Sequence, residues 1–166
     1  RRLSSAASDV YKRQLINRLG FNNDGVDKIV DRLRNKGNVI IGGNIGKNKV
    51  TPNENAKDDY LTCFKALYDH VDYFAVNVSS PNTPNLRDLQ NINDLREILF
   101  PLIKENKKRE TKPILIKISP DLNDSDIKKI VDLSFDLKID GIITSNTTLD
   151  RNCLLYTSPS PRDKSS

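Results

Sequence analysis

The chain has 166 residues, 30% of them charged, and its 27 basic and 22 acidic residues give a formal net charge of +5. This length fits one ordinary domain with a buried core. No apolar run approaches the roughly 20 residues of a membrane-spanning helix, so nothing in the sequence predicts one. The two cysteines and one histidine offer no disulfide framework and no metal-binding spacing, so we predict no metal site.

The two ends of the chain differ in character from its middle. Residues 9–14 are DVYKRQ and residues 153–158 are CLLYTS. One short DNA element, inserted in opposite orientations, would encode both segments, and it resembles a transposase library adapter. We therefore expect residues 1–14 and 153–166 to be non-native processing scars, and residues 15–152 to be a partial domain. The alternative is a pair of disordered tails rich in Ser, Pro and Arg.

Removing these ends changes the charge and cysteine arguments. The removal takes away six basic and two acidic residues, which leaves 21 against 20 and a net charge of +1. The basic balance of the whole chain therefore gives no support to a nucleic-acid-binding function. Cys63 is then the only cysteine left, which fits a reducing compartment.

The first predicted elements are a helix and a strand. Apolar residues three and four positions apart predict a helix that Asn23 or Asp24 caps and that Gly37 stops. The β-branched run at 39–43 has no polar alternation, which predicts a strand covered on both faces.

A second helix and strand follow. Thr51, Pro52 and Glu54 form a helix-start pattern, with an N-cap, a proline at the first helical position and a glutamate at the third. A second strand is expected at 73–78. The apolar face of this second helix is expected to contain Ala56, Tyr60, Cys63, Phe64, Leu67 and Val71.

The remaining elements continue the same alternation. An apolar stripe over 95–103 predicts a third helix, which Pro101 should kink or split in two. A third strand is expected at 113–118. Residues 123–126 should cap a fourth helix, and a fourth strand is expected at 140–144.

A strict alternation of strand and helix predicts parallel βα units, in either an open doubly wound sheet or a closed barrel. No strand is followed by a Gly-x-Gly-x-x-Gly turn or a Gly-x-x-x-x-Gly-Lys loop, which weakens the nucleotide-binding open sheet. Polar residues gather after all four strands, and in a barrel these strand ends share one face. We therefore predict an α/β fold that is part of a (β/α)₈ TIM barrel, with about four βα units and two open sheet edges. The residues gathered at the strand ends are Asn44, Asn77, Ser80, Lys117 and Asn146.

This set is rich in amides and poor in charge, with no carboxylate pair. Amides present donors and acceptors, which suits a flat heterocycle, and a lone lysine suits a site where negative charge develops, such as a reduced flavin. A serine without a histidine partner argues against a Ser-His-Asp hydrolase. Two alternatives stay open at this point: Asn44 could simply end a strand, and Lys117 could be solvated at the sheet edge.

Five short sequence motifs, found in this order along the chain, resemble those of a known family. Over essentially all of residues 15–152 the chain resembles the class 2, quinone-linked dihydroorotate dehydrogenases. The motifs are INRLGFN at 16–22, GNIGKN at 43–48, NVSSPNT at 77–83, LIKISPD at 115–121 and TSNTT at 144–148.

The resemblance implies a flavin-containing (β/α)₈ barrel that oxidises dihydroorotate to orotate in de novo pyrimidine biosynthesis. FMN would accept the hydride, and a quinone would be the final acceptor. Ser80 would be the catalytic base, where class 1 relatives carry cysteine, and the segment 83–87 would be mobile and close over the substrate. The implied substrate-binding residues are Asn17, Arg18, Leu19, Gly20, Phe21, Asn77, Asn82, Asn146 and Thr147. The implied FMN-binding residues are Asn44, Asn77, Lys117 and Ser145.

The same resemblance implies partners and a location. We expect dihydroorotate or orotate and a quinone as partners, and no nucleic acid. The enzyme would lie on the cytoplasmic side of the bacterial inner membrane through an N-terminal segment missing from this chain, or alternatively on the mitochondrial inner membrane. Because the family's first and last strands are also missing, we expect this polypeptide alone to be inactive. The alternative functions are a related FMN barrel that acts on another dihydropyrimidine, and an inert non-enzymatic fragment.

Overall fold

The computed structural model describes residues 6–9, 14–17 and 20–152. Its main sheet has four parallel strands that neighbour one another in chain order. They are β3 (Gly42–Ile45), β4 (Tyr73–Asn77), β5 (Ile114–Ile118) and β6 (Gly141–Thr144). A separate antiparallel hairpin pairs β1 (Ala6–Asp9) with β2 (Gln14–Asn17).

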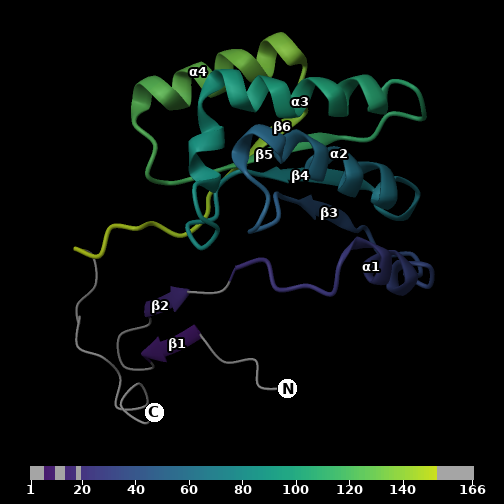
Figure 1. Ribbon diagram of the computed structural model, residues 1–166, viewed down its shortest axis with the longest axis horizontal. Helices are drawn as coiled ribbons and strands as arrows, with labels where there is room; N and C mark the ends of the chain where they lie inside the picture. The colour runs from purple at the N-terminus through teal and green to yellow at the C-terminus, as the bar shows by residue number, and fades with distance from the viewer. Residues whose placement is uncertain (1–5, 10–13, 18–19, 153–166) are drawn as a thin grey trace.

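Helices alternate with the strands of the main sheet. Figure 1 shows α2, α3 and α4 stacked along the same side of the sheet, with α1 beside the start of β3. Because the strand order never reverses and these helices share one side, the sheet is wound in one direction, as in a barrel and unlike a doubly wound sheet. The helices are α1 (Val26–Leu33), α2 (Ala56–Leu67), α3 (Ile92–Asn106) and α4 (Asp124–Leu137). Short 3₁₀ turns are η1 (Asn53–Asn55), η2 (Tyr68–His70) and η3 (Leu86–Gln90).

Side chains alternate between the two faces of the sheet, as pleated strands require. Phe74, Val76 and Ile116 point to the helices and are fully buried. The ring of Phe74 packs on that of Phe64 in α2, with 4.2 Å between the ring centroids. The helix-facing side of the sheet is therefore the core of the described part of the chain.

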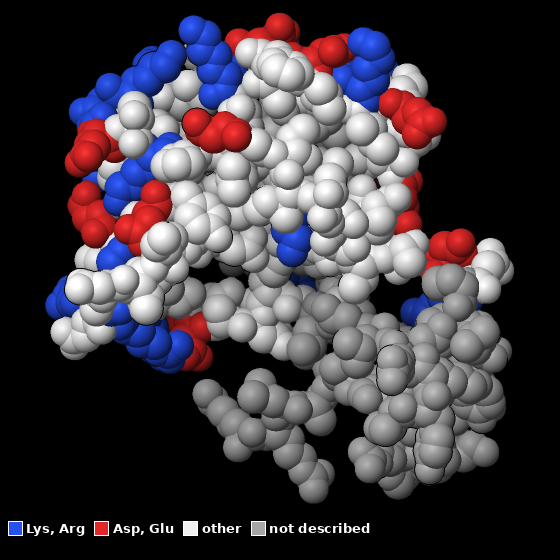
Figure 2. Space-filling view, turned by 180° about the vertical axis from the view of Figure 1, so that it is seen from behind, with Lys and Arg blue, Asp and Glu red and all other residues white. Residues whose placement is uncertain are grey.

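The surface of the folded body carries charges of both signs. In the view from behind, acidic and basic side chains are interspersed along the margins, and most of the middle is uncharged (Figure 2). This distribution matches the near balance of basic and acidic residues in the middle of the sequence.

Strand β3, the first strand that the sequence predicts, starts later than expected. Val39 and Ile40 are 61% and 83% exposed, so the expected burial of this run on both faces is wrong for its first residues. The backbone of Ile41 is bound by Asp72, whose carboxylate accepts from the Ile41 amide at 2.7 Å and whose amide donates to the Ile41 carbonyl. Regular pairing begins only at Gly42, opposite Tyr73.

Two predicted helix starts are also wrong. Gly25 occupies the N-cap position of α1 with a φ of 93°, and the Asn23 side chain accepts from the Gly25 amide instead of capping the helix. The Thr51 pattern does not begin α2, because the Thr51 carbonyl binds the Lys47 ammonium and a 3₁₀ turn precedes the helix at Ala56.

The other helices agree better with their sequence signals. On α2 the predicted apolar face is buried at Ala56, Tyr60, Phe64 and Leu67. Helix α3 continues through Pro101 as one element, so the predicted split does not occur. The Asn123 side chain caps α4 by accepting from the Asp126 amide at 2.9 Å, as predicted.

Candidate active site

A hollow of about 290 Å³ opens on the sheet face opposite the helices. The register pairs Asn44 with Ala75 in the neighbouring strand, and Lys117 stands between Asn77 and Ile143. Lys117 is therefore on an inner strand, and the interpretation that placed it at a sheet edge is wrong. The residues that line the hollow are Gly42, Asn44, Tyr73, Ala75, Lys117 and Ile143.

Asn77 ends β4 and is only 2% exposed. Its Oδ1 accepts from the amide and the hydroxyl of Ser79, at 3.1 and 2.9 Å. The Ser79 Oγ in turn accepts from Nδ2 of Asn146 at 3.1 Å. A buried hydrogen-bond chain thus joins the end of β4 to the loop after β6, and it unites two of the predicted substrate-binding residues.

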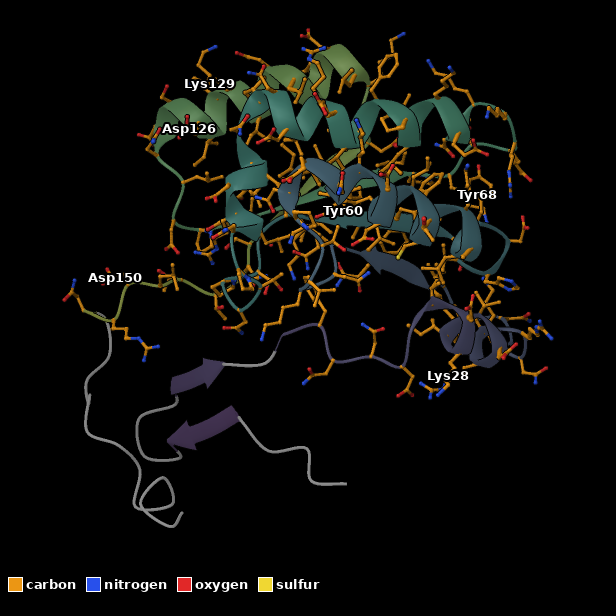
Figure 3. All side chains as sticks on the ribbon, in the orientation of Figure 1. Lys28, Tyr60, Tyr68, Asp126, Lys129 and Asp150 are labelled. Atoms are coloured by element: carbon orange, nitrogen blue, oxygen red, sulfur yellow. The ribbon has the colours of Figure 1, made fainter. Side chains whose placement is uncertain are left out.

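Tyr60 supports this chain from the helix layer (Figure 3). Its hydroxyl donates to the Asn77 carbonyl at 2.9 Å, and its side chain is fully buried. Burial raises the pKa of Tyr60 well above its ordinary value, so the phenol is neutral and stays a donor.

Ser80 follows this chain and is only 5% exposed. Its Oγ accepts from the Asn82 amide at 3.3 Å. A Cβ built on Gly20 would lie 3.8 Å from the Asn82 carbonyl oxygen, and one built on Gly46 would lie 2.9 Å from the Phe21 ring. The structure therefore brings Gly20 and Phe21 against the loops that follow β4 and β3.

Two of the remaining predicted substrate residues, Arg18 and Leu19, lie outside the described residues, and Asn17 is the last residue of β2. In the loop after β6, the Thr147 amide donates to Oδ1 of Asn146 at 2.8 Å. Ser145 follows a cis peptide bond and is exposed.

Arg87 joins the three loops that follow β4, β5 and β6, and the sequence analysis implied no role for it beyond its place at the end of the segment 83–87. Its Nε donates to the Ser79 carbonyl at 2.9 Å, its Nη2 donates to the Thr147 carbonyl at 2.6 Å, and its Nη1 pairs with the Asp121 carboxylate. Nothing in the sequence marks this arginine, because two of its acceptors are backbone carbonyls. Asp121 is the last residue of the motif LIKISPD at 115–121, but the resemblance implied no role for it in the site.

Asp121 is bound from several sides. Its carboxylate accepts from the Thr148 hydroxyl and from the Leu149 amide. Burial by itself would raise the pKa of Asp121, but the hydrogen bonds from Thr148, Leu149 and Arg87 outweigh it and hold that pKa below its ordinary range. The carboxylate is therefore ionised opposite the guanidinium.

The segment 83–87 is packed in this structure. Thr83 and Leu86 are 5% and 0% exposed, and the Asn53 side chain donates to the Asn85 carbonyl at 2.9 Å. The expectation that this segment is mobile stays a prediction.

Neither a metal site nor a membrane span emerges from the described ranges. Residues 6–9, 14–17 and 20–152 contain no cluster of three or more His, Cys, Asp or Glu that could hold a metal ion. Over the same residues, no helix combines the length and apolar character needed to cross a membrane.

The fold and the site define a class: a segment of a (β/α)₈ barrel with a hollow that an asparagine and a lysine line, and with further asparagines and a buried serine at the carboxyl ends of its strands. The model of the family described as dihydroorotate dehydrogenase matches residues 5–165. The chain belongs to the dihydroorotate dehydrogenase family.

Relatives named dihydroorotate dehydrogenase (quinone) agree with this assignment. The chain is 55% identical to the protein of Christiangramia forsetii over 141 residues, which are 84% of this chain and 42% of that relative. It is 51% identical to the protein of Mycolicibacterium smegmatis over 142 residues, which are 85% of this chain and 39% of that relative. The chain thus spans well under half the length of these curated relatives.

Solved structures support the barrel. The ligand-free DHODH of Eimeria tenella matches with a TM-score of 0.79 and 34% identity, over 86% of this chain and 46% of that one. The same enzyme in complex with ferulenol matches with a TM-score of 0.75 over 82% of this chain and 44% of that one. The predicted fold and family are confirmed, whereas the assignment of residues 1–14 and 153–166 as scars stays a prediction.

Proposed function

We propose that the complete enzyme to which this chain belongs oxidises dihydroorotate to orotate in de novo pyrimidine biosynthesis, with FMN as hydride acceptor and a quinone as final acceptor. Family membership and the relatives' names support this proposal. The observation that carries it to residues is the buried Ser80, next to the hydrogen-bond chain that joins Asn77, Ser79 and Asn146.

Ser80 acts as the catalytic base in this proposal. Its Oγ takes the proton from C5 of dihydroorotate while a hydride leaves C6, so that the C5–C6 double bond of orotate forms. The serine passes its own hydroxyl proton to a hydrogen-bonded water. An isolated hydroxyl is a weak base at neutral pH, so the water that receives the Ser80 proton is essential to this role.

The amides bind the substrate ring. Orotate presents an imide edge and a carboxylate, and the side chains of Asn77, Asn82 and Asn146 offer both donors and acceptors to these groups. We assign Gly20, Phe21 and Thr147, with Asn17, Arg18 and Leu19, to the same substrate site.

The polar groups that line the hollow fit a flavin. Asn44 and Lys117 both line the space, and Ala75, with its small side chain, lines it from the strand between theirs. FMN, when bound, supplies the hydride acceptor. The Lys117 ammonium would stabilise the negative charge that develops on the reduced ring, with Asn44, Asn77 and Ser145 as further contacts.

We place the enzyme on the cytoplasmic side of a bacterial inner membrane, where a membrane-dissolved quinone is available. Contact with the membrane surface is assigned to the complete enzyme. No nucleic-acid partner forms part of the proposal, because the middle of the sequence is nearly neutral.

Replacing the base tests the proposal. In the full-length enzyme, Ser80→Ala should lower turnover of dihydroorotate at least about 100-fold, the lower bound for a lost general base, while bound flavin stays at the wild-type level. The assay is quinone reduction per bound flavin, followed by absorbance.

Ser134→Ala is the matched control. Ser134 is also a buried serine, but it lies on α4 and donates to the Ile130 carbonyl, away from the strand ends. It should keep wild-type turnover per flavin. Turnover that survives in Ser80→Ala would remove Ser80 from the role of base.

A further inference from the structure

A single guanidinium holds together three loops, two of which carry the proposed base and substrate ligands. Arg87 donates to the Ser79 carbonyl at 2.9 Å, to the Thr147 carbonyl at 2.6 Å and to the Asp121 carboxylate. These three acceptors belong to the loops after β4, β6 and β5. The Arg87 side chain is only 16% exposed, whereas its acceptors Asp121 and Thr147 lie nearer the surface.

The two backbone acceptors have a specific place in the site. Ser79 directly precedes Ser80, and Thr147 directly follows Asn146. The Ser79 hydroxyl also accepts from the Asn146 side chain, so the same two loops meet at a second point. Arg87 thus binds the residue next to the proposed base and the residue next to a proposed substrate ligand.

The geometry requires arginine. A guanidinium is planar and presents its donors in a fixed fork, whereas a lysine ammonium is a single point charge on a flexible stem. One ammonium cannot reach three acceptors that the structure places around the separate nitrogens Nε, Nη1 and Nη2. Asp121 neutralises the charge and is itself anchored by the Thr148 hydroxyl and the Leu149 amide.

We infer that Arg87, with Asp121 as its counter-ion, is a positioning residue that fixes the separation between Ser80 and Asn146 and so sets the rate of hydride and proton removal from the substrate. This inference rests on the proposed function. A displacement of about 1 Å in a catalytic group can cost up to about 100-fold in rate, so loosening this contact should slow the chemical step.

The test separates the two half-reactions of the full-length enzyme. Under anaerobic stopped-flow conditions, dihydroorotate reduces the bound flavin, and a soluble quinone then reoxidises it. In Arg87→Lys and in the nearly isosteric Asp121→Asn, flavin reduction should slow at least about tenfold, while reoxidation per flavin stays within about twofold of wild type. A merely structural defect would lower flavin content without separating the two rates.

Lys112→Met is the matched control. The Lys112 ammonium also bridges two backbone carbonyls, those of Tyr68 and Val71, but at the opposite end of the sheet. This variant should lose stability and keep the wild-type rate of flavin reduction. Equal slowing in Lys112→Met and Arg87→Lys, or wild-type flavin reduction in both Arg87→Lys and Asp121→Asn, would overturn the inference.

The same experiment distinguishes failure of the proposed function from failure of the positioning role. If the wild-type full-length enzyme does not reduce its flavin with dihydroorotate, the proposed reaction is wrong, and the role of Arg87 in it falls as well. If wild type reduces its flavin and the Arg87 and Asp121 variants match it, only the positioning role is lost.

Discussion

Tyr60 links the helix layer to the site through one atom. Its hydroxyl donates to the carbonyl of Asn77, whose side chain organises Ser79 and, through it, Asn146. The ring itself is fully buried in the core. The same residue therefore contributes to packing with its ring and to the site with its hydroxyl.

We predict that Tyr60→Phe lowers the free energy of unfolding by about 1–3 kcal/mol, because it leaves the buried Asn77 carbonyl without its donor. Tyr73→Phe removes the same atom from a half-buried tyrosine on the open face, and it should change stability by less than about 0.5 kcal/mol. Urea denaturation followed by circular dichroism measures both values. Equal losses in the two variants would show that the Asn77 contact contributes nothing of its own.

The sequence could predict some site residues and not others, for a physical reason. Asn44, Asn77 and Lys117 stand at the ends of recognisable strands, and parallel strands bring their carboxyl ends to one edge. Arg87 acts on carbonyls of Ser79 and Thr147, and the directions of these carbonyls depend on loop conformation. No residue type or spacing encodes that direction.

The start of α4 is the clearest example of local sequence deciding an element. Asn123 has extended backbone angles and accepts from the Asp126 amide, which satisfies one of the free donors at the helix start. Asn55 occupies the same position on α2 but makes no side-chain cap bond.

These two asparagines form a matched pair for a test. Asn123→Ala should lower the free energy of unfolding by about 1 kcal/mol, and Asn55→Ala should lower it by clearly less, because only the first loses a cap bond. Urea midpoints at a constant slope give both numbers. A larger loss for Asn55→Ala would contradict the assigned caps.

Tertiary packing explains two places where the local sequence predicted the wrong secondary structure. Pro101 normally costs about 3 kcal/mol inside a helix. Leu95, Ile98, Leu99 and Leu102 lie on both sides of this proline and are buried, and their burial outweighs that cost. At the start of β3, by contrast, the apolar Val39 and Ile40 find no cover among the described residues, and the strand begins only where Tyr73 pairs with Gly42.

At the scale of the molecule, the described sheet supplies four parallel strands, where a (β/α)₈ barrel has eight. The hollow proposed to hold the flavin lies on the face of this sheet that the described helices leave uncovered (Figure 1). Strand order and the shared helix side were predictable from the alternation of elements and the positions of polar residues, whereas the outer limits of the native domain were not.

We predict that this chain alone binds FMN weakly or not at all and is inactive, because the four parallel strands among the described residues enclose only part of the site. FMN titration followed by flavin fluorescence measures binding, with the full-length enzyme as the positive control. Tight, stoichiometric quenching by this chain would contradict the prediction.

The order of the strands also has a consequence for the backbone amides. In the main sheet β4 and β5 have a partner on each side, whereas β3 and β6 each have one partner among the described residues. Hydrogen exchange in this chain should therefore be slowest at the centre, in β4 and β5, and faster in β3 and β6, where local opening breaks only one ladder. In a complete barrel every strand has a partner on each side. The difference in exchange rate between inner and outer strands should therefore be smaller in the complete enzyme than in this chain.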